Sequence, residues 1–168
     1  DDFFTHVLRG LLVAIEVHGI GRAPLGARPQ VRRITEHFRQ RHPGLDDLRP
    51  AAIFDTNGAI VTAAVSENGG KAHFLGAFPD DEDKLEHVMR EALATSDMLI
   101  LSGGTSKGEG DVSHRIVTRL GKPGIVAHGV ALKPGKPLCL AVADGKPVII
   151  LPGFPTSAMF TFHDFVVP

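Results

Sequence analysis

The sequence has too few cysteines for a disulfide and no stretch long enough for a membrane span. Its single cysteine, Cys139, has no second cysteine with which to form an internal disulfide or a cysteine-rich metal site. No apolar run reaches the roughly 18 residues that cross a bilayer, and no signal-peptide pattern opens the chain. These absences indicate a protein of the reducing cytoplasm. Because the chain starts without methionine and stops after an apolar run at Pro168, we expect it to be a piece of a longer protein.

An excess of charge and the motifs of several enzyme classes are also missing. The formal net charge is -1 at pH 7, whereas nucleic acids and anionic membranes favour strongly basic surfaces, so we expect a small-molecule partner. The nine histidines form no HExxH or HxxxH pair, and no serine lies in a GxSxG turn, which argues against a zinc site and an α/β-hydrolase. Cys139 lies in an apolar segment without a neighbouring histidine, which is typical of a buried small residue rather than a nucleophile.

The composition indicates one domain, because 43% of the residues are apolar and 22% are charged. Residues 51–168 carry the regular pattern of a folded domain. Residues 1–50 contribute an apolar run at 11–17, which suits a first core strand, and an Arg/Pro-rich connector with a short helix at 31–41; we expect them to belong to the same domain. The arginines of the connector are interpreted as a solvated surface, with an acidic partner as the alternative.

From residue 51 onward, helical and strand-like patterns alternate. The expected elements are a helix starting at Asp55 or Thr56 and ending before Gly69-Gly70, a strand at 72–78, a helix capped by Asp80 and Asp81, a strand at 97–102, a helix from about Asp111, strands at 138–142 and 147–151 around an Asp144-Gly145 turn, and a helix from Pro155. The order strand, helix, strand, glycine loop, helix predicts an α/β fold with a right-handed βαβα unit.

A glycine-rich loop, 102–110, directly follows the strand at 97–102, where open α/β sheets bind their ligands. Glycines let backbone N–H groups approach an anion, and the start of a helix adds a positive dipole end. We therefore expect Gly103, Gly104, Thr105 and Ser106 to bind phosphate, with an ordinary strand-to-helix turn as the alternative. The spacing differs from GxxxxGK[ST] and from GxGxxG, which argues against ATPases and dinucleotide-dependent dehydrogenases.

Two carboxylates follow the ends of predicted strands. If the strands before Asp80 and Asp111 share one sheet, both side chains lie at one edge and can hold a divalent cation beside a phosphate. Oxygen ligands of this kind suit Mg²⁺. The alternative is that both residues are helix N-caps.

Two further segments carry groups suited to an oxyanion. The turn Lys133-Pro134-Gly135-Lys136-Pro137 places two ammonium groups between β-prone segments, with a solvated turn as the alternative. The segment 151–157, LPGFPTS, leads from a strand into a helix and offers backbone amides and hydroxyls. The candidate binding residues of these segments are Lys133, Lys136, Pro152, Gly153 and Ser157.

Five motifs occur together in a fixed order: Asp55-Thr56-Asn57, Pro79-Asp80-Asp81, SGGTSKGEGD at 102–111, KPGKP at 133–137 and LPGFP at 151–155. Over about residues 53–168 they resemble the molybdopterin-binding domain of the MoeA and gephyrin family. The resemblance implies a three-layer αβα domain, in which we expect a mainly parallel sheet and a terminal hairpin. It also implies Mg²⁺-dependent conversion of adenylylated molybdopterin and molybdate into molybdenum cofactor and AMP, the reaction of a molybdopterin molybdotransferase.

The resemblance extends to individual residues. It implies active-site roles for Asp80, Asp111 and Lys133, Mg²⁺ at the two aspartates, and a phosphate loop of Gly103, Gly104 and Thr105.

Three positions depart from the family pattern: an acidic turn is replaced by His18-Gly19-Ile20-Gly21, a lysine by Gly129 and an asparagine by Phe154. Two functions are therefore considered, a molybdotransferase domain and a non-catalytic module that binds a pterin or nucleotide as a sensor. A homo-oligomer and further domains of a longer chain are possible assemblies.

Overall fold

The computed structural model describes residues 10–16, 56–78, 81–103 and 111–168. The elements in these ranges are β1 (Gly10–Glu16), α2 (Thr56–Glu67), β2 (Lys71–Phe78), α3 (Glu82–Thr95), β3 (Met98–Ser102), α4 (Asp111–Leu120), β4 (Pro123–His128), β5 (Cys139–Ala143), β6 (Lys146–Leu151) and α5 (Pro155–Phe165). Every predicted element with described residues is present. The helix expected at 31–41 and the turn at 18–21 lie outside the described residues.

The strands form one six-stranded sheet in the order β2-β1-β3-β6-β5-β4. Of the strand pairs described, β3 and β6 run parallel, whereas the other four pairs run antiparallel. The prediction of a mainly parallel sheet is therefore wrong. The physical reason is that β1 lies antiparallel between β2 and β3, so these two strands share a direction without being neighbours.

The predicted hairpin is present, but it is part of the sheet instead of a terminal addition. Asp144 and Gly145 have φ angles of 49° and 86°, the left-handed conformation that a tight turn of this type requires at both positions. The hairpin places β6 beside β3 in the middle of the sheet. The sequence analysis did not predict β4, which begins at Pro123, contains Gly124 with φ 85° and has a register irregularity after Ile125.

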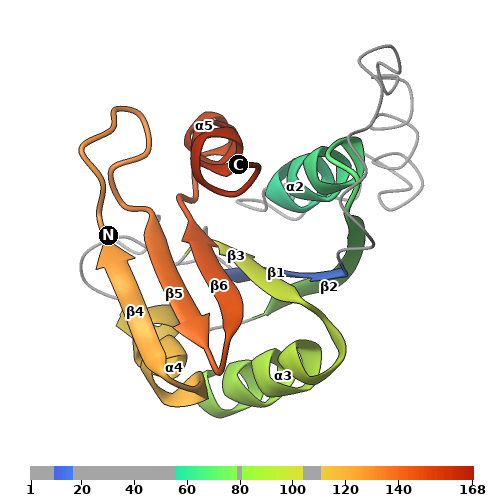
Figure 1. Cartoon of the computed structure of the whole chain (residues 1–168), viewed down its shortest axis with the longest axis vertical. Coiled ribbons are helices and arrows are strands. Elements are labelled where there is room, and N and C mark those ends of the chain that lie inside the picture. The colour runs from blue at the N-terminus through green and yellow to red at the C-terminus, as the bar shows by residue number, and fades with distance from the viewer. Residues whose placement is uncertain (1–9, 17–55, 79–80, 104–110) are drawn as a thin grey trace, which may run out of the picture.

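Helices cover both faces of the sheet, which confirms the three-layer arrangement (Figure 1). Neighbouring residues of a strand point to opposite faces, so β6 sends Val148 and Ile150 toward α3 and α4, and Ile149 and Leu151 toward α2 and α5. Cys139 is fully buried in the first of these two cores, and burial raises the pKa of its thiol to about 11. The predicted role of Cys139 as a small buried residue is thus confirmed.

An exposed network of charges joins the two helices on one face. Glu82 of α3 binds Arg115 and Arg119 of α4 at 3.1 and 2.7 Å, and Glu86 binds Arg119 at 2.8 Å. The hydrogen bonds that these carboxylates accept, first from Arg115 for Glu82 and from Arg90 for Glu86, lower the pKa of both. None of the helices in the described ranges is long and apolar enough to cross a bilayer.

Candidate functional site

Several separate segments end at the same edge of the sheet. In the strand register, Phe78 at the end of β2 lies opposite Gly10, and Ser102 at the end of β3 lies opposite both Leu11 and Leu151. The carboxyl ends of β2, β3 and β6 therefore share one edge. Residues 129–138, which connect β4 to β5, lie at this edge too, because Cys139 pairs with Ile150 near the end of β6. We call this edge, with residues 102–103, 129–138 and 151–157, the rim.

The first residue of the predicted phosphate loop is already engaged by the sheet. Gly103 has φ 94°, a left-handed conformation that favours glycine, and its N–H donates to Leu151 O at 3.3 Å. Gly103 therefore turns the chain out of β3 while its own amide is used within the fold. The remaining predicted loop residues, Gly104, Thr105 and Ser106, lie outside the described residues.

The start of α5 is open to an acceptor from outside the helix. Phe154 occupies the N-cap position and supplies no side-chain hydrogen bond, and Pro155 begins the helix. The first turn of a helix leaves backbone N–H groups without intrahelical partners, so the amides of Thr156 and Ser157 are directed past the helix end. Pro152 is buried and Gly153 is partly buried, and together they form the turn that leads from β6 into α5. This geometry suits an anion.

The KPGKP turn is tightly closed and carries two exposed lysines. Its backbone is held by hydrogen bonds from Val130 N to Lys136 O at 2.9 Å and from Leu138 N to Gly135 O at 3.1 Å. Gly135 has φ 126°, and a Cβ at this position would lie 2.6 Å from Thr161 Cγ2 of α5. The turn thus rests directly on α5. Within the described part of the chain, the side-chain ammonium groups of Lys133 and Lys136 have no hydrogen-bond or ion-pair partner, and both residues are exposed.

The structure separates the two roles considered for the aspartates at the start of α3. Asp81 is the N-cap, because its Oδ1 accepts from Lys84 N at 3.2 Å. The hydrogen bond from the Lys84 side chain, together with this backbone bond, lowers the pKa of Asp81. Asp80 precedes the cap and lies outside the described residues. Its neighbour therefore performs the capping that was considered for Asp80.

The second predicted metal ligand, Asp111, is the first residue of α4. Four and eight residues further along α4, Arg115 and Arg119 bind Glu82 at 3.1 and 2.7 Å, so the start of α3 lies beside the second and third turns of α4. No group of three or more potential metal ligands occurs among the described residues, so the Mg²⁺ site at Asp80 and Asp111 stays a prediction.

A hydrogen-bond network that the sequence analysis did not anticipate connects three segments at the rim. Asn57 Nδ2, in the first turn of α2, donates to Ser102 Oγ and to Gly153 O, both at 2.7 Å. Ser102 Oγ donates in turn to Pro152 O at 3.2 Å. The asparagine lies 45 residues from Ser102 in the sequence, and an asparagine near a helix start is usually read as a cap, which hides this contact.

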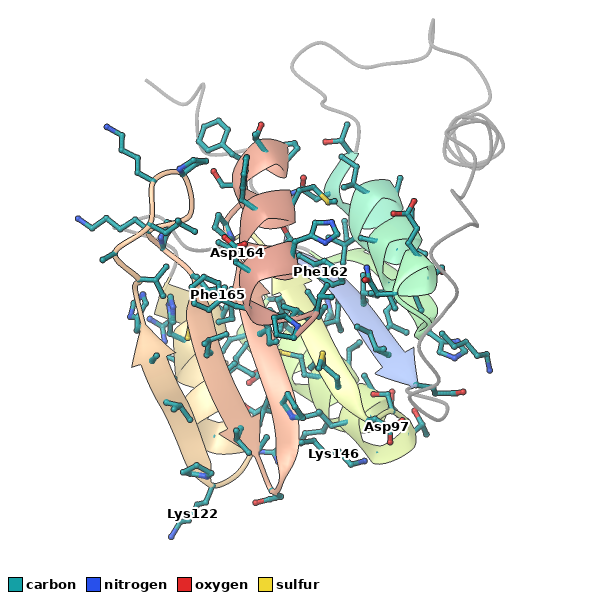
Figure 2. All side chains as sticks on the ribbon, turned by 45° about the horizontal axis from the view of Figure 1, so that its top comes forward. Asp97, Lys122, Lys146, Phe162, Asp164 and Phe165 are labelled. Carbon is teal, nitrogen blue, oxygen red and sulfur yellow. The ribbon has the colours of Figure 1, made fainter. Side chains whose placement is uncertain are left out.

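The rim therefore combines an uncapped helix start, two unpaired ammonium groups and a glycine turn. Lys122 and Lys146 lie at the opposite edge of the sheet, near the β5–β6 turn (Figure 2). A ligand with phosphate or another oxyanion finds complementary groups at the rim.

Comparison with known proteins identifies the family to which this domain belongs. Residues 45–168 match the family described as "Probable molybdopterin binding domain". The chain is 36% identical over 124 residues to a molybdopterin molybdenumtransferase of Nostoc sp., covering 72% of this chain and 28% of that protein. It is 29% identical over 168 residues to molybdopterin molybdenumtransferase 2 of Mycobacterium tuberculosis, covering 98% of this chain and 40% of that protein.

A solved structure shares the fold. The molybdopterin biosynthesis MoeA protein from Pyrococcus horikosii matches with a TM-score of 0.65 and 36% sequence identity, over 76% of this chain and 31% of that one. The chain thus spans between 28% and 40% of the length of the two transferases. Because the family match covers residues 45–168, which include the rim and both helical layers, the chain belongs to the molybdopterin-binding domain family and is related to molybdopterin molybdenumtransferases.

Proposed function

We propose that this chain binds molybdopterin and its adenylylated form at the rim and there combines the pterin with molybdate, giving molybdenum cofactor and AMP. The observation that carries the proposal is the convergence of the ends of β2, β3 and β6 and of the KPGKP turn at one edge. Segments with candidate anion-binding groups thereby end at the same edge of the sheet, although they are distant in the sequence.

In this proposal the phosphate is bound by two backbone segments. Gly104, Thr105 and Ser106 supply amides and hydroxyls from one side, with Gly103 forming the turn that leads to them. The first turn of α5 supplies the amides of Thr156 and Ser157 from the other side, because Phe154 leaves the helix start uncapped. Pro152 and Gly153 set the position of that helix start.

Molybdate is attracted by Lys133 and Lys136, the two ammonium groups of the KPGKP turn. Both are exposed, and their positive charges have no partner within the described ranges, so an oxyanion does not have to displace an existing ion pair. Gly135 rests on Thr161, which fixes the turn that carries the two charges. We assign Lys133 the role nearest to the reacting groups, as the family resemblance implies.

Mg²⁺ is assigned to Asp80 and Asp111. When bound there, the ion would neutralise phosphate charge as the phosphoanhydride of the adenylylated pterin is cleaved. Near these two positions, Asp81 provides the cap of α3, and the salt bridge between Arg115 and Glu82 holds α4 against α3.

A non-catalytic binding module is the second candidate, and two observations favour it. Phe154, which replaces an asparagine of the family motif, is 80% exposed and brings no polar group to the rim. Gly129 replaces a lysine and has φ 85°, a conformation that disfavours a side chain. Turnover distinguishes the two candidates, because a sensor would bind the pterin without producing AMP.

Calorimetry with molybdopterin or AMP and with Gly104→Val tests the binding proposal. The valine would block the approach of phosphate to the loop, so binding should be lost, and Thr105→Val should weaken it. If neither ligand binds the unaltered chain, or if Gly104→Val binds equally well, the phosphate site is assigned wrongly.

The metal assignment is tested with Asp80→Asn and Asp111→Asn, with Asp83→Asn as the control in the first turn of α3. Asparagine caps helices well but is a poorer Mg²⁺ ligand, so Mg²⁺-dependent affinity for adenylylated molybdopterin should be lost while the melting temperature is retained. Unchanged Mg²⁺ dependence in both variants would remove the metal site.

The wider assignment concerns the whole protein. We propose that residues 1–50 and 51–168 form one domain, which the position of β1 inside the sheet supports. We also propose a cytoplasmic location and a homo-oligomer. Further domains in a longer chain are proposed as well, in line with the length of the relatives.

A further inference from the structure

The hydrogen bonds of Asn57 and Ser102 define a small unit at the rim, which we call the Asn57 clamp. It consists of the bonds from Asn57 Nδ2 to Ser102 Oγ and Gly153 O, and from Ser102 Oγ to Pro152 O. Ser102 is 2% exposed and its bond to Pro152 O is buried, whereas the two bonds from Asn57 are partly buried. It joins the first turn of α2, the end of β3 and the turn before α5.

The direction of every bond in the clamp is fixed by two groups that can only accept. The carbonyl oxygen of Pro152 takes the single hydroxyl hydrogen of Ser102, and the carbonyl oxygen of Gly153 takes one amide hydrogen of Asn57. The second amide hydrogen of Asn57 then goes to Ser102 Oγ, which has accepting capacity left. All the donors of both side chains are used.

Among the described residues, one polar atom of the clamp has no partner. Asn57 Oδ1 is buried and accepts no hydrogen bond from any described residue. A rotation of the amide that exchanged oxygen and nitrogen would place Oδ1 against Gly153 O, where two acceptors repel. The hydrogen bonds that hold the 152–153 turn therefore outweigh the free-energy cost of burying Asn57 Oδ1.

We propose that Asn57 and Ser102 are positioning residues, which set the distance between the end of β3, at Ser102 and Gly103, and the start of α5. Ser102 is followed by Gly103, whose N–H binds Leu151 O, so side chain and backbone tie the same two segments together. This inference rests on the proposed function in one respect: the two segments bracket the oxyanion. A phosphate whose oxygens bridge both segments would lose contacts if the 152–153 turn moved.

The chain contains a matched control for each residue of the clamp. Asn68, at the other end of α2, donates from Nδ2 to Ala64 O at 2.8 Å, so Asn68→Ala removes an amide-to-carbonyl bond without touching the rim. Ser96, which is 4% exposed, donates to Ala92 O and is the counterpart of the buried Ser102. The variants to compare are Asn57→Ala with Asn68→Ala, and Ser102→Ala with Ser96→Ala.

The first measurement is calorimetric affinity for inorganic phosphate and for molybdate, at a temperature where all variants are folded. We expect Asn57→Ala and Ser102→Ala to weaken binding about tenfold, because a small displacement of a binding group has a large effect on affinity. The control variants should bind like the unaltered chain even if their melting temperatures fall equally. In the double variant Asn57→Ala/Ser102→Ala, the loss should be smaller than the sum of the two single losses.

The second measurement needs no ligand and keeps this inference separate from the proposed function. Hydrogen exchange at the Gly103 amide, which bonds to Leu151 O, should accelerate at least about tenfold in Asn57→Ala and stay unchanged in Asn68→Ala. If the unaltered chain bound neither anion, the proposed function would fail while the exchange comparison would still decide the clamp. Equal exchange at Gly103 in the two asparagine variants, or equal affinities where binding occurs, would overturn the positioning role.

Discussion

The two edges of the sheet use their polar groups in different ways. At the edge opposite the rim, Asp144 Oδ1 accepts from Lys122 N at 3.0 Å, and Lys146 Nζ reaches Leu93 O at the end of α3 at 2.5 Å. At the rim, Lys133 and Lys136 contact no acceptor in the described part of the structure. The lysine that is bound inside the fold stabilises it, whereas the lysines that are not bound remain available to a ligand.

The largest expected effect is on stability, at the rim turn. Gly135→Ala would bring a Cβ to 2.6 Å from Thr161 Cγ2 at φ 126°, so we expect a loss of about 3 kcal/mol in the free energy of unfolding. Chemical denaturation measures it. Gly145→Ala is the control, since that site has positive φ but no atom within 4 Å. Thr161→Ser removes the clashing methyl and should restore part of the loss; an equal cost at Gly135 and Gly145 would contradict the packing argument.

At the opposite edge, Lys146→Ala should lower the free energy of unfolding by roughly 1–3 kcal/mol, because it removes a charged hydrogen bond to Leu93 O. Lys122→Ala is the control, because the fold uses the backbone of Lys122 rather than its exposed side chain. Equal melting temperatures for the two variants would erase the distinction between bound and available lysines.

Oxyanion affinity gives the converse test. The double variant Lys133→Ala/Lys136→Ala should bind molybdate or phosphate about tenfold more weakly at low ionic strength, equivalent to about 1.4 kcal/mol, and added salt should shrink the difference. Lys122→Ala should bind normally, because its charge lies at the other edge. If removal of Lys122 weakened binding as much as removal of both rim lysines, the attraction would be a general effect of charge.

The smallest effect is expected where charges are exposed and already paired. The arginines around Glu82 and Glu86 lower the pKa of both carboxyls below the ordinary value of 4.5. A lowered folded pKa stabilises the fold above about pH 4.5, and this contribution is lost as pH falls through the folded pKa. Between about pH 6 and pH 3, the melting temperature of Glu82→Gln/Glu86→Gln should therefore decrease less steeply than that of the unaltered chain. Added salt should reduce this difference. Identical pH profiles would show that the network adds nothing measurable.

Local features of this fold could be predicted from the sequence, whereas strand neighbours could not. The apolar run at 98–102 and the Asp144-Gly145 turn identify their elements because strand length, apolar content and turn chemistry are local properties. The position of β1 between β2 and β3 depends on contacts between residues that are far apart in the sequence. The periodicity of apolar residues gives no information about such contacts. The β4 strand was missed because Pro123 and Gly124 are unfavourable in strands.

The site divides in the same way. The motifs identified the segments of the rim, and the register shows that the ends of β3 and β6 and the KPGKP turn meet at one edge. Individual hydrogen bonds could not be predicted from the sequence. The Gly103 N–H donates to Leu151 O, and Asp81 rather than Asp80 caps α3. The roles of Asp80, Asp111 and Gly104 remain predictions.

The place of β1 has a consequence for how the chain can fold and be shortened. Strand β1, Gly10 to Glu16, pairs with Lys71 to Phe78, and more than fifty residues lie between the two strands in the sequence. Contacts of such high sequence separation form slowly during folding. The family match begins at residue 45, yet a truncated chain starting there would lack β1 altogether. Strand β3, at 98–102, would then lose its partner on one side and become an apolar edge strand with unpaired backbone groups. Such strands pair with strands of other molecules and lead to aggregation.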